Sequence, residues 1–255
     1  MFLGFEYMKY RWNAKRRHGV HSPFVYELTD KCFRSSISPL FIERMSTLKS
    51  RMKGNKKSIQ ITDHGVGSKR MGDLRSLGQL YKNSSSKGKY GQMLFQLMQH
   101  YNLESALELG TSVGIGSVSM ATGNKNAVVT TIEGCPNTRK EALSNFEALG
   151  IENIQSLGGT FADVIPTLPE STYDLIFIDG HHDGEAMLRY IKMLLPHSHD
   201  DTFWILDDIR WSPSMKAAWE QLQHDEGFHV TIDLFRMGMV LKRPQQEKEH
   251  FDILI

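Results

Sequence analysis

Three carboxylates stand where two apolar segments of the chain end. Asp179 follows the apolar run 173–178, and Asp207 and Asp208 follow the run 203–206. If these runs are neighbouring parallel strands, their carboxyl ends meet at one edge of a sheet and bring the three side chains together. Carboxylates that converge without a partner repel one another and raise each other's pKa. The cluster therefore requires a cation, or hydrogen-bond donors, to compensate its negative charge.

Two interpretations of this cluster are open from the residues alone. A divalent cation would relieve the repulsion, and oxygen ligands favour Mg²⁺, Ca²⁺ or Mn²⁺ over zinc. The carboxylates could instead cap the helices that follow and hydrogen-bond a cofactor. His182, three residues after Asp179, could act as a general base near neutral pH or could be a loop histidine bonded to the backbone.

A glycine-rich turn, Glu108–Gly116, forms the second candidate site. It leaves an apolar strand and opens a helix, so glycines let the backbone turn tightly while the new helix offers free N–H groups to an anion. Glu133 ends the next expected strand, 25 residues after Glu108, where a carboxylate can accept hydrogen bonds from both ribose hydroxyls. The spacing is G-x-x-x-G-x-G, so the dinucleotide fingerprint G-x-G-x-x-G is absent.

Alternating strands and helices must position both sites. Apolar strand patterns, with helical patterns between them, fall at 105–109, 127–132, 154 onward, 173–178, 203–206, 228–232 and 237–241. Pro136 and Ser212-Pro213 mark helix starts, and Gly150 marks a helix end. This order predicts an α/β fold with a mostly parallel seven-stranded sheet, a terminal antiparallel strand and helices on both faces.

On these motifs the chain resembles the class I S-adenosylmethionine-dependent methyltransferases. The segment ELGTSVGIGS looks like their first cofactor motif, and TIEG looks like the second. The resemblance implies a Rossmann-like fold, S-adenosylmethionine as cofactor, and Glu133 on the ribose. The cofactor contacts that it implies are Glu108, Gly110, Thr111, Ser112, Gly114, Gly116, Glu133, Thr160 and Asp179. The adenine motif of the family usually carries an acidic residue after glycine, and the segment GGTF around Thr160 departs from it.

Residues 84–245 look most like the O-methyltransferases related to catechol and caffeoyl-coenzyme A enzymes. The segments KGKYGQMLFQL, FIDGHH and ILDDI carry this similarity. It implies methyl transfer to an oxygen of a small-molecule acceptor, with Asp179, Asp207 and Asp208 as ligands of Mg²⁺ or a similar cation. It also implies that His182 and Asp179 are catalytic. Two positions depart from the family: Asp208 replaces an asparagine, and His182 replaces a lysine.

Composition adds a strong charge asymmetry. The net charge is +1, but residues 1–90 hold 19 Lys and Arg against 6 Asp and Glu, and residues 91–255 hold 11 against 23. A basic half can bind nucleic acid or anionic lipid, or it can pack against acidic parts of the protein. Two distant cysteines form neither a disulfide framework nor a zinc site, and we expect a cytoplasmic protein.

We expect three segments: a mainly helical basic arm at 1–83, a methyltransferase domain at 84–245 and a tail at 246–255. One alternative function is an RNA methyltransferase that holds phosphates with the basic arm. Another is a non-catalytic cofactor-binding or membrane-surface module. The sequence allows a nucleic-acid partner without favouring it, disfavours a membrane surface and is compatible with a homodimer.

Overall fold

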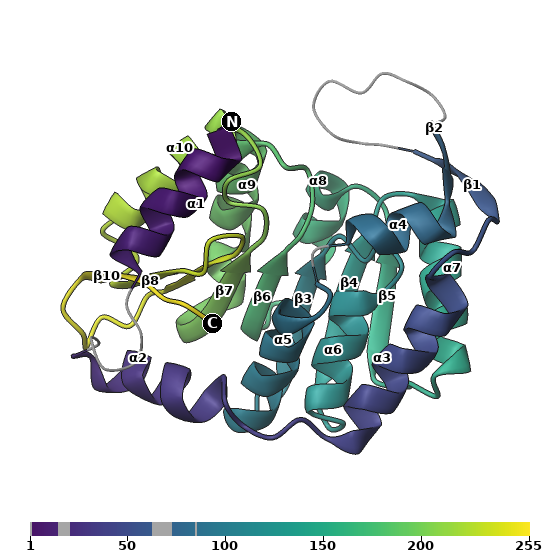
Figure 1. Ribbon diagram of the computed structural model, residues 1–255, viewed down its shortest axis with the longest axis horizontal. Helices are drawn as coiled ribbons and strands as arrows, with labels where there is room; N and C mark the ends of the chain where they lie inside the picture. The colour runs from purple at the N-terminus through teal and green to yellow at the C-terminus, as the bar shows by residue number, and fades with distance from the viewer. Residues whose placement is uncertain (1, 15–20, 63–72, 85) are drawn as a thin grey trace. The chain divides into compact units, whose positions relative to one another are not determined.

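The structure is a computed structural model, and it describes residues 2–14, 21–62, 73–84 and 86–255. The chain divides into two compact units, each with its own core. The first unit contains residues 1–34 and 170–255, and the second contains residues 35–169. Figure 1 labels the helices and strands. None of the helices in the described ranges has the length and apolar character to span a bilayer.

The second unit is built on three parallel strands in the order β3-β4-β5. Its described elements are α3 (Pro39–Met52), β1 (Ser58–Ile61), β2 (Asp73–Ser76), α4 (Leu77–Asn83), α5 (Lys89–His100), β3 (Ser105–Leu109), α6 (Ile115–Gly123), β4 (Val128–Glu133), α7 (Pro136–Ala148), β5 (Ile154–Gly158), α8 (Phe161–Val164) and a 3₁₀ turn (Ile165–Thr167). In Figure 1, α5 and α6 lie side by side in front of the strands. Pro136 begins α7, and Gly150, at φ +60°, follows its end, so both predicted helix signals are confirmed.

The first unit contains the strand order β10-β8-β9-β7-β6. Its described elements are α1 (Phe2–Asn13), α2 (Pro23–Glu27), a π-helical turn (Leu28–Cys32), β6 (Tyr173–Ile178), α9 (Gly184–Leu194), a 3₁₀ turn (Leu195–His197), β7 (Ser198–Leu206), α10 (Pro213–His224), β8 (Val230–Asp233), β9 (Gly238–Leu241) and β10 (Glu249–Asp252). β6 and β7 are parallel, whereas β9 runs antiparallel to both β7 and β8, as the predicted antiparallel pair requires.

Two features of the fold concern the predicted segments, which stay a prediction. β10 lies in the stretch expected to be a tail, where it pairs in parallel with β8 and buries Phe251. The expected boundary after residue 83 does not coincide with the division into units, because α3 packs on α6 and α4 packs on α3.

Basic residues of the expected arm bind polar groups of the second unit itself. Arg44 donates to Thr122 Oγ1 at 3.1 Å, and Arg51 donates to Asn145 Oδ1 at 3.1 Å. Lys57 forms an ion pair with Glu141 at 2.5 Å. These three cations therefore serve packing inside the unit, which favours the second of the two interpretations of the basic half.

Candidate functional site

The glycine-rich turn at the end of β3 has an unusual backbone conformation. Gly110, Ser112 and Gly114 all have positive φ, at 104°, 49° and 91°. At Gly114 an added Cβ would lie 2.5 Å from Cε1 of Phe146, so both the backbone angle and the space require glycine. Gly116 is buried in the first turn of α6. The backbone of the turn can therefore adopt this path only with glycine at position 114.

Glu133 is fixed beside this turn by backbone donors. The Ser112 N–H donates to Glu133 Oε2 at 2.9 Å, and the Cys135 N–H donates to Oε1 at 2.9 Å. Each carboxylate oxygen has a second lone pair for a further donor. Glu133 and Ser112 are half-buried rather than enclosed. The end of β4 therefore presents a carboxylate that two backbone N–H groups orient.

A buried network supports the turn from below. The Glu108 carboxylate accepts bonds from the hydroxyls of Ser117 and Thr131, the latter at 2.6 Å, and the Thr131 hydroxyl lies 2.6 Å from that of Thr111. Burial raises the pKa of Glu108 to about 7, although the bonds from Ser117 and Thr131 act in the opposite direction. With its side chain engaged in this way, Glu108 connects β3, β4 and α6 and fixes the turn.

Thr160 begins the helix α8. Its hydroxyl donates to Asp163 Oδ2 at 2.6 Å and accepts from the Asp163 N–H at 3.3 Å. This is an N-cap bond. Gly159 precedes it with φ +144°, and its N–H donates to the Glu133 carbonyl at 3.1 Å. The GGTF segment is therefore joined to the end of β4 through the backbone.

In the first unit, Arg236 lies among the predicted metal ligands. Arg236 Nε is 3.0 Å from Asp208 Oδ1 and 3.6 Å from Asp207 Oδ1. Burial lowers the pKa of Arg236, but the charges of Asp207, Asp208 and Asp179 outweigh it and raise that pKa above its ordinary value. The three carboxylates thus act on one guanidinium, which supplies positive charge to the cluster.

The two histidines after β6 have different surroundings. His181, at φ +67°, places Nδ1 2.8 Å from the Tyr190 hydroxyl and stacks on that ring. His182 Nδ1 lies 3.7 Å from Asp208 Oδ2, and its ring lies 5.4 Å from the ring of Trp211. Both His182 and Trp211 are exposed to solvent. His182 is therefore the accessible histidine beside the acidic cluster.

Comparison with known proteins agrees with these motifs. Residues 107–209, which span the glycine-rich turn, Glu133 and all three aspartates, match a family described as a methyltransferase domain. Over these residues the chain is similar to a methyltransferase domain. The catechol O-methyltransferase of Mycobacterium tuberculosis is 27% identical over 128 residues, which cover 49% of this chain and 56% of that protein. The chain spans about half the length of the curated relatives that it matches.

Solved structures show the same fold. The SAH-bound methyltransferase PaMTH1 of Podospora anserina superposes with a TM-score of 0.60 at 15% identity, over 88% of this chain and 97% of that one. The O-methyltransferase of Bacillus cereus in complex with SAH gives a TM-score of 0.55 at 16% identity, over 82% and 93% of the two chains. The predicted fold of class I methyltransferases is therefore confirmed.

The structure places the predicted site residues in two sets. The set Glu108, Gly110, Thr111, Ser112, Gly114, Gly116, Glu133 and Thr160 belongs to the second unit, and the set Asp179, His182, Asp207 and Asp208 belongs to the first. Their roles toward a ligand stay predictions. Arg236 was missed because it lies in the turn between β8 and β9, where nothing in the local sequence indicates a site.

Proposed function

We propose that the protein binds S-adenosylmethionine through the second unit and transfers its methyl group to an oxygen of a small-molecule acceptor. The observation that carries the proposal is the Glu133 carboxylate, which two backbone N–H groups orient beside the glycine-rich turn. A ribose presents two neighbouring hydroxyl donors, and a fixed carboxylate accepts both. The names of the matching relatives, which include a catechol O-methyltransferase, support oxygen as the acceptor atom.

The residues of the turn fit this cofactor. When bound, S-adenosylmethionine supplies an electrophilic methyl group on a sulfonium. The turn Gly110–Gly114 would approach its methionine end with backbone atoms, because Gly110 and Gly114 carry no side chain that would hold the cofactor away. Glu133 would hold the ribose, and Thr160 would begin the segment facing the adenine. Glu108 would position the turn without touching the cofactor, because the Glu108 side chain is buried beneath the turn.

On the acceptor side, His182 would remove the proton of the acceptor hydroxyl. A neutral imidazole takes the proton on a ring nitrogen, which leaves the acceptor oxygen with the electron pair that forms the new O–CH₃ bond. Asp208, 3.7 Å from Nδ1, would stabilise the resulting imidazolium. Trp211, beside His182, offers an aromatic surface to a planar acceptor.

A metal fits these residues poorly. Arg236 already balances Asp207 and Asp208. In the described part of the chain, the set of three His, Cys, Asp or Glu side chains whose ligand atoms all lie within 4.8 Å of one another is Asp233, His250 and Asp252, not the three aspartates. We therefore derive no step through a cation and expect Arg236 to hold the carboxylates in place.

A turnover screen tests the proposal. The purified full chain is incubated with S-adenosylmethionine and, in separate reactions, small phenols, catechols, carboxylic acids or RNA. S-adenosylhomocysteine is quantified with and without Mg²⁺ or a chelator. The proposal predicts turnover with a phenolic acceptor that neither Mg²⁺ nor chelator changes, and a His182→Ala variant about 10²-fold slower. Turnover only on RNA would support the alternative RNA methyltransferase, and absence of turnover on every acceptor would contradict the proposed acceptor class.

A further inference from the structure

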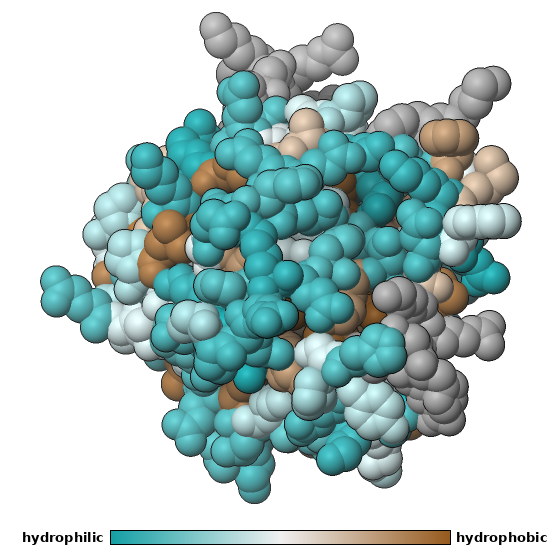
Figure 2. All heavy atoms as spheres, turned by 90° about the vertical axis from the view of Figure 1, so that its left-hand side faces the viewer, coloured by the Kyte–Doolittle hydropathy of each residue, from teal (hydrophilic) through white to brown (hydrophobic). Residues whose placement is uncertain are grey.

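The N-terminal helix α1 presents an apolar stripe to solvent. Phe5, Met8 and Trp12 follow each other at spacings of three and four residues, so they lie on one face of the helix. They are 62%, 65% and 91% exposed. Figure 2 looks onto the side of the molecule that carries α1 in Figure 1, and brown apolar residues emerge there among hydrophilic ones. Fully exposed tryptophan beside exposed phenylalanine and methionine is uncommon on a surface without a partner.

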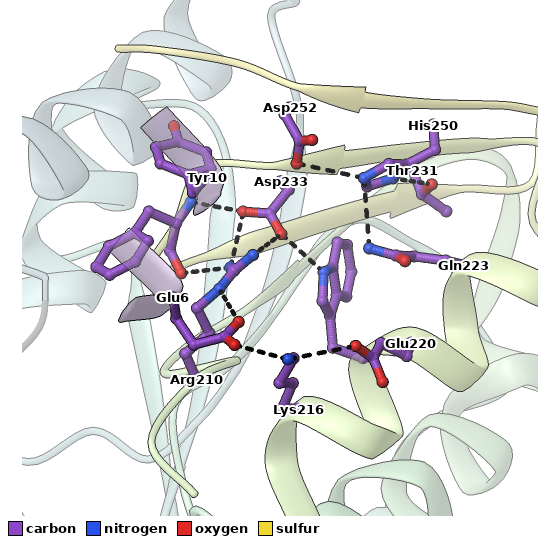
Figure 3. A network of polar contacts seen from close by, with 12 residues as sticks. Glu6, Tyr10, Arg210, Lys216, Glu220, Gln223, Thr231, Asp233, His250 and Asp252 are labelled. Carbon is purple, nitrogen blue, oxygen red and sulfur yellow. Dashed lines mark hydrogen bonds and ion pairs between the residues drawn. The ribbon is translucent and has the colours of Figure 1, made fainter. Parts of the chain in front are cut away.

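The opposite face of α1 is anchored on the first unit. Tyr10 is buried and donates its hydroxyl to the carbonyl of Ile253. Glu6 is buried, 2.8 Å from Lys216 Nζ and 3.7 Å from Arg210 Nε. Figure 3 shows Glu6 pointing toward Arg210, which also forms a two-bond ion pair with Asp233 at 2.7 and 2.8 Å. The guanidinium carbon of Arg210 lies 5.8 Å from the centre of the Tyr10 ring. The inner contacts therefore determine which face of the helix points outward.

This orientation separates the charges of the segment. Glu6 is the only acidic residue among the first 20 residues, and the anchor turns it inward. The basic residues are Lys9 and Arg11, both exposed, and Lys15, Arg16 and Arg17, which lie outside the described residues. On the helix, Lys9 and Arg11 fall on either side of the stripe. The outward face thus combines apolar side chains with the positive charges of Lys9 and Arg11.

We propose that α1 docks this face on an anionic membrane surface. Phe5, Met8 and Trp12 would enter the boundary between headgroups and acyl chains, and the flanking cations would meet lipid phosphates. A second copy of the chain is a poorer occupant, because two such faces would bring their basic residues together. Nucleic acid is also a poorer occupant, because the methionine of the stripe neither stacks on bases nor binds phosphate. This proposal, which the exposure of Trp12 motivates, differs from the expectation drawn from the sequence that a membrane surface is disfavoured.

Vesicle flotation of the full chain tests this proposal. Vesicles of phosphatidylcholine alone are compared with vesicles of phosphatidylcholine and phosphatidylglycerol. We expect binding to the anionic vesicles only, a steep loss of binding in high salt, and about fivefold weaker binding for Lys9→Gln. Phe5→Ser and Trp12→Ser should each weaken binding roughly tenfold. Ile42→Ser is the matched control, because Ile42 is 60% exposed on α3 and should not affect binding.

Intrinsic fluorescence provides a second readout. Trp204 and Trp219 are buried, so emission that responds to vesicles comes from Trp12 or Trp211. A blue shift with anionic vesicles that Trp12→Phe abolishes, in a variant whose thermal unfolding is unchanged, would support docking through α1. No binding to anionic vesicles, or equal binding by wild type and the α1 variants, would overturn the proposal. A dimer or an RNA complex that Trp12→Ser disrupts, without vesicle binding, would also overturn it.

Discussion

Burial of Glu108 makes the stability of the protein depend on pH in a direction that follows from the structure. The side chain is 1% exposed, and burial raises the pKa of its carboxyl from 4.5 to about 7. The hydrogen bonds from Ser117 and Thr131 lower it only in part, and the charge of Glu133 raises it further. In the unfolded chain the pKa returns to its ordinary value. The folded protein therefore retains this proton between pH 4.5 and 7, and its stability falls as pH rises through that window.

The magnitude follows from the two pKa values. A difference of about 2.5 between them corresponds to about 3 kcal/mol, of which about 2.5 kcal/mol is lost between pH 5 and pH 8. The Glu108→Gln variant is neutral at every pH and keeps an oxygen that can accept from Ser117 and Thr131. Its free energy of unfolding should therefore lack this component of the pH dependence.

Urea unfolding followed by circular dichroism at pH 5, 6, 7 and 8 measures this component. The difference in free energy of unfolding between wild type and Glu108→Gln should shift by about 2.5 kcal/mol in favour of the variant from pH 5 to pH 8. Glu152→Gln, which changes an exposed carboxylate, is the control and should follow the wild type. The same pH dependence in wild type and Glu108→Gln would refute the reasoning about burial.

Three further predictions follow from single sites. Gly114→Ala should destabilise the protein by about 1–3 kcal/mol and lower its thermal midpoint, because the new Cβ meets Phe146 at a positive φ; an unchanged midpoint would contradict the required glycine. Arg236→Gln should lower the thermal midpoint, because the carboxylates lose their cation, and 10 mM Mg²⁺ should partly restore the midpoint of this variant. The midpoint of the wild type should not change with Mg²⁺. An equal rise in wild type and variant would argue for a metal site. Burial raises the pKa of the Cys32 thiol to about 12, with a smaller contribution from Glu27, so Cys32 should react with a thiol reagent at pH 8 only after urea is added; rapid reaction of the native thiol would show that it is accessible.

Local signals in the sequence were sufficient to predict the helices and strands that carry the candidate site. Pro136 and the pair Ser212-Pro213 begin α7 and α10 because proline tolerates the first helical turn and serine caps it, and Ser212 Oγ accepts the Met215 N–H at 3.2 Å. β10 could not be predicted in the same way. Its residues EHFD are polar except for Phe251, and only pairing with β8 makes them a strand.

The residues of the candidate site also include some that could be predicted from the sequence and some that could not. The position of Glu133 beside the glycine-rich turn was predictable because it follows a strand that comes directly after that turn and its helix. Its role toward a ligand stays a prediction. Arg236 was not predictable, because its partners Asp207 and Asp208 precede it by 28 or more residues and lie on another element. The inward orientation of Glu6 toward Lys216 likewise depends on residues about 210 positions apart. Long-range ion pairs leave no pattern in a single sequence.

Titration calorimetry with S-adenosylmethionine tests the central claim most directly. We predict saturable one-to-one binding by the wild type and about 10²-fold weaker binding by Glu133→Ala, since two hydrogen bonds to a charged acceptor are lost. Glu147→Gln, an exposed carboxylate on α7, should bind like the wild type. Absence of binding by the wild type, or equal affinity in Glu133→Ala, would contradict the account.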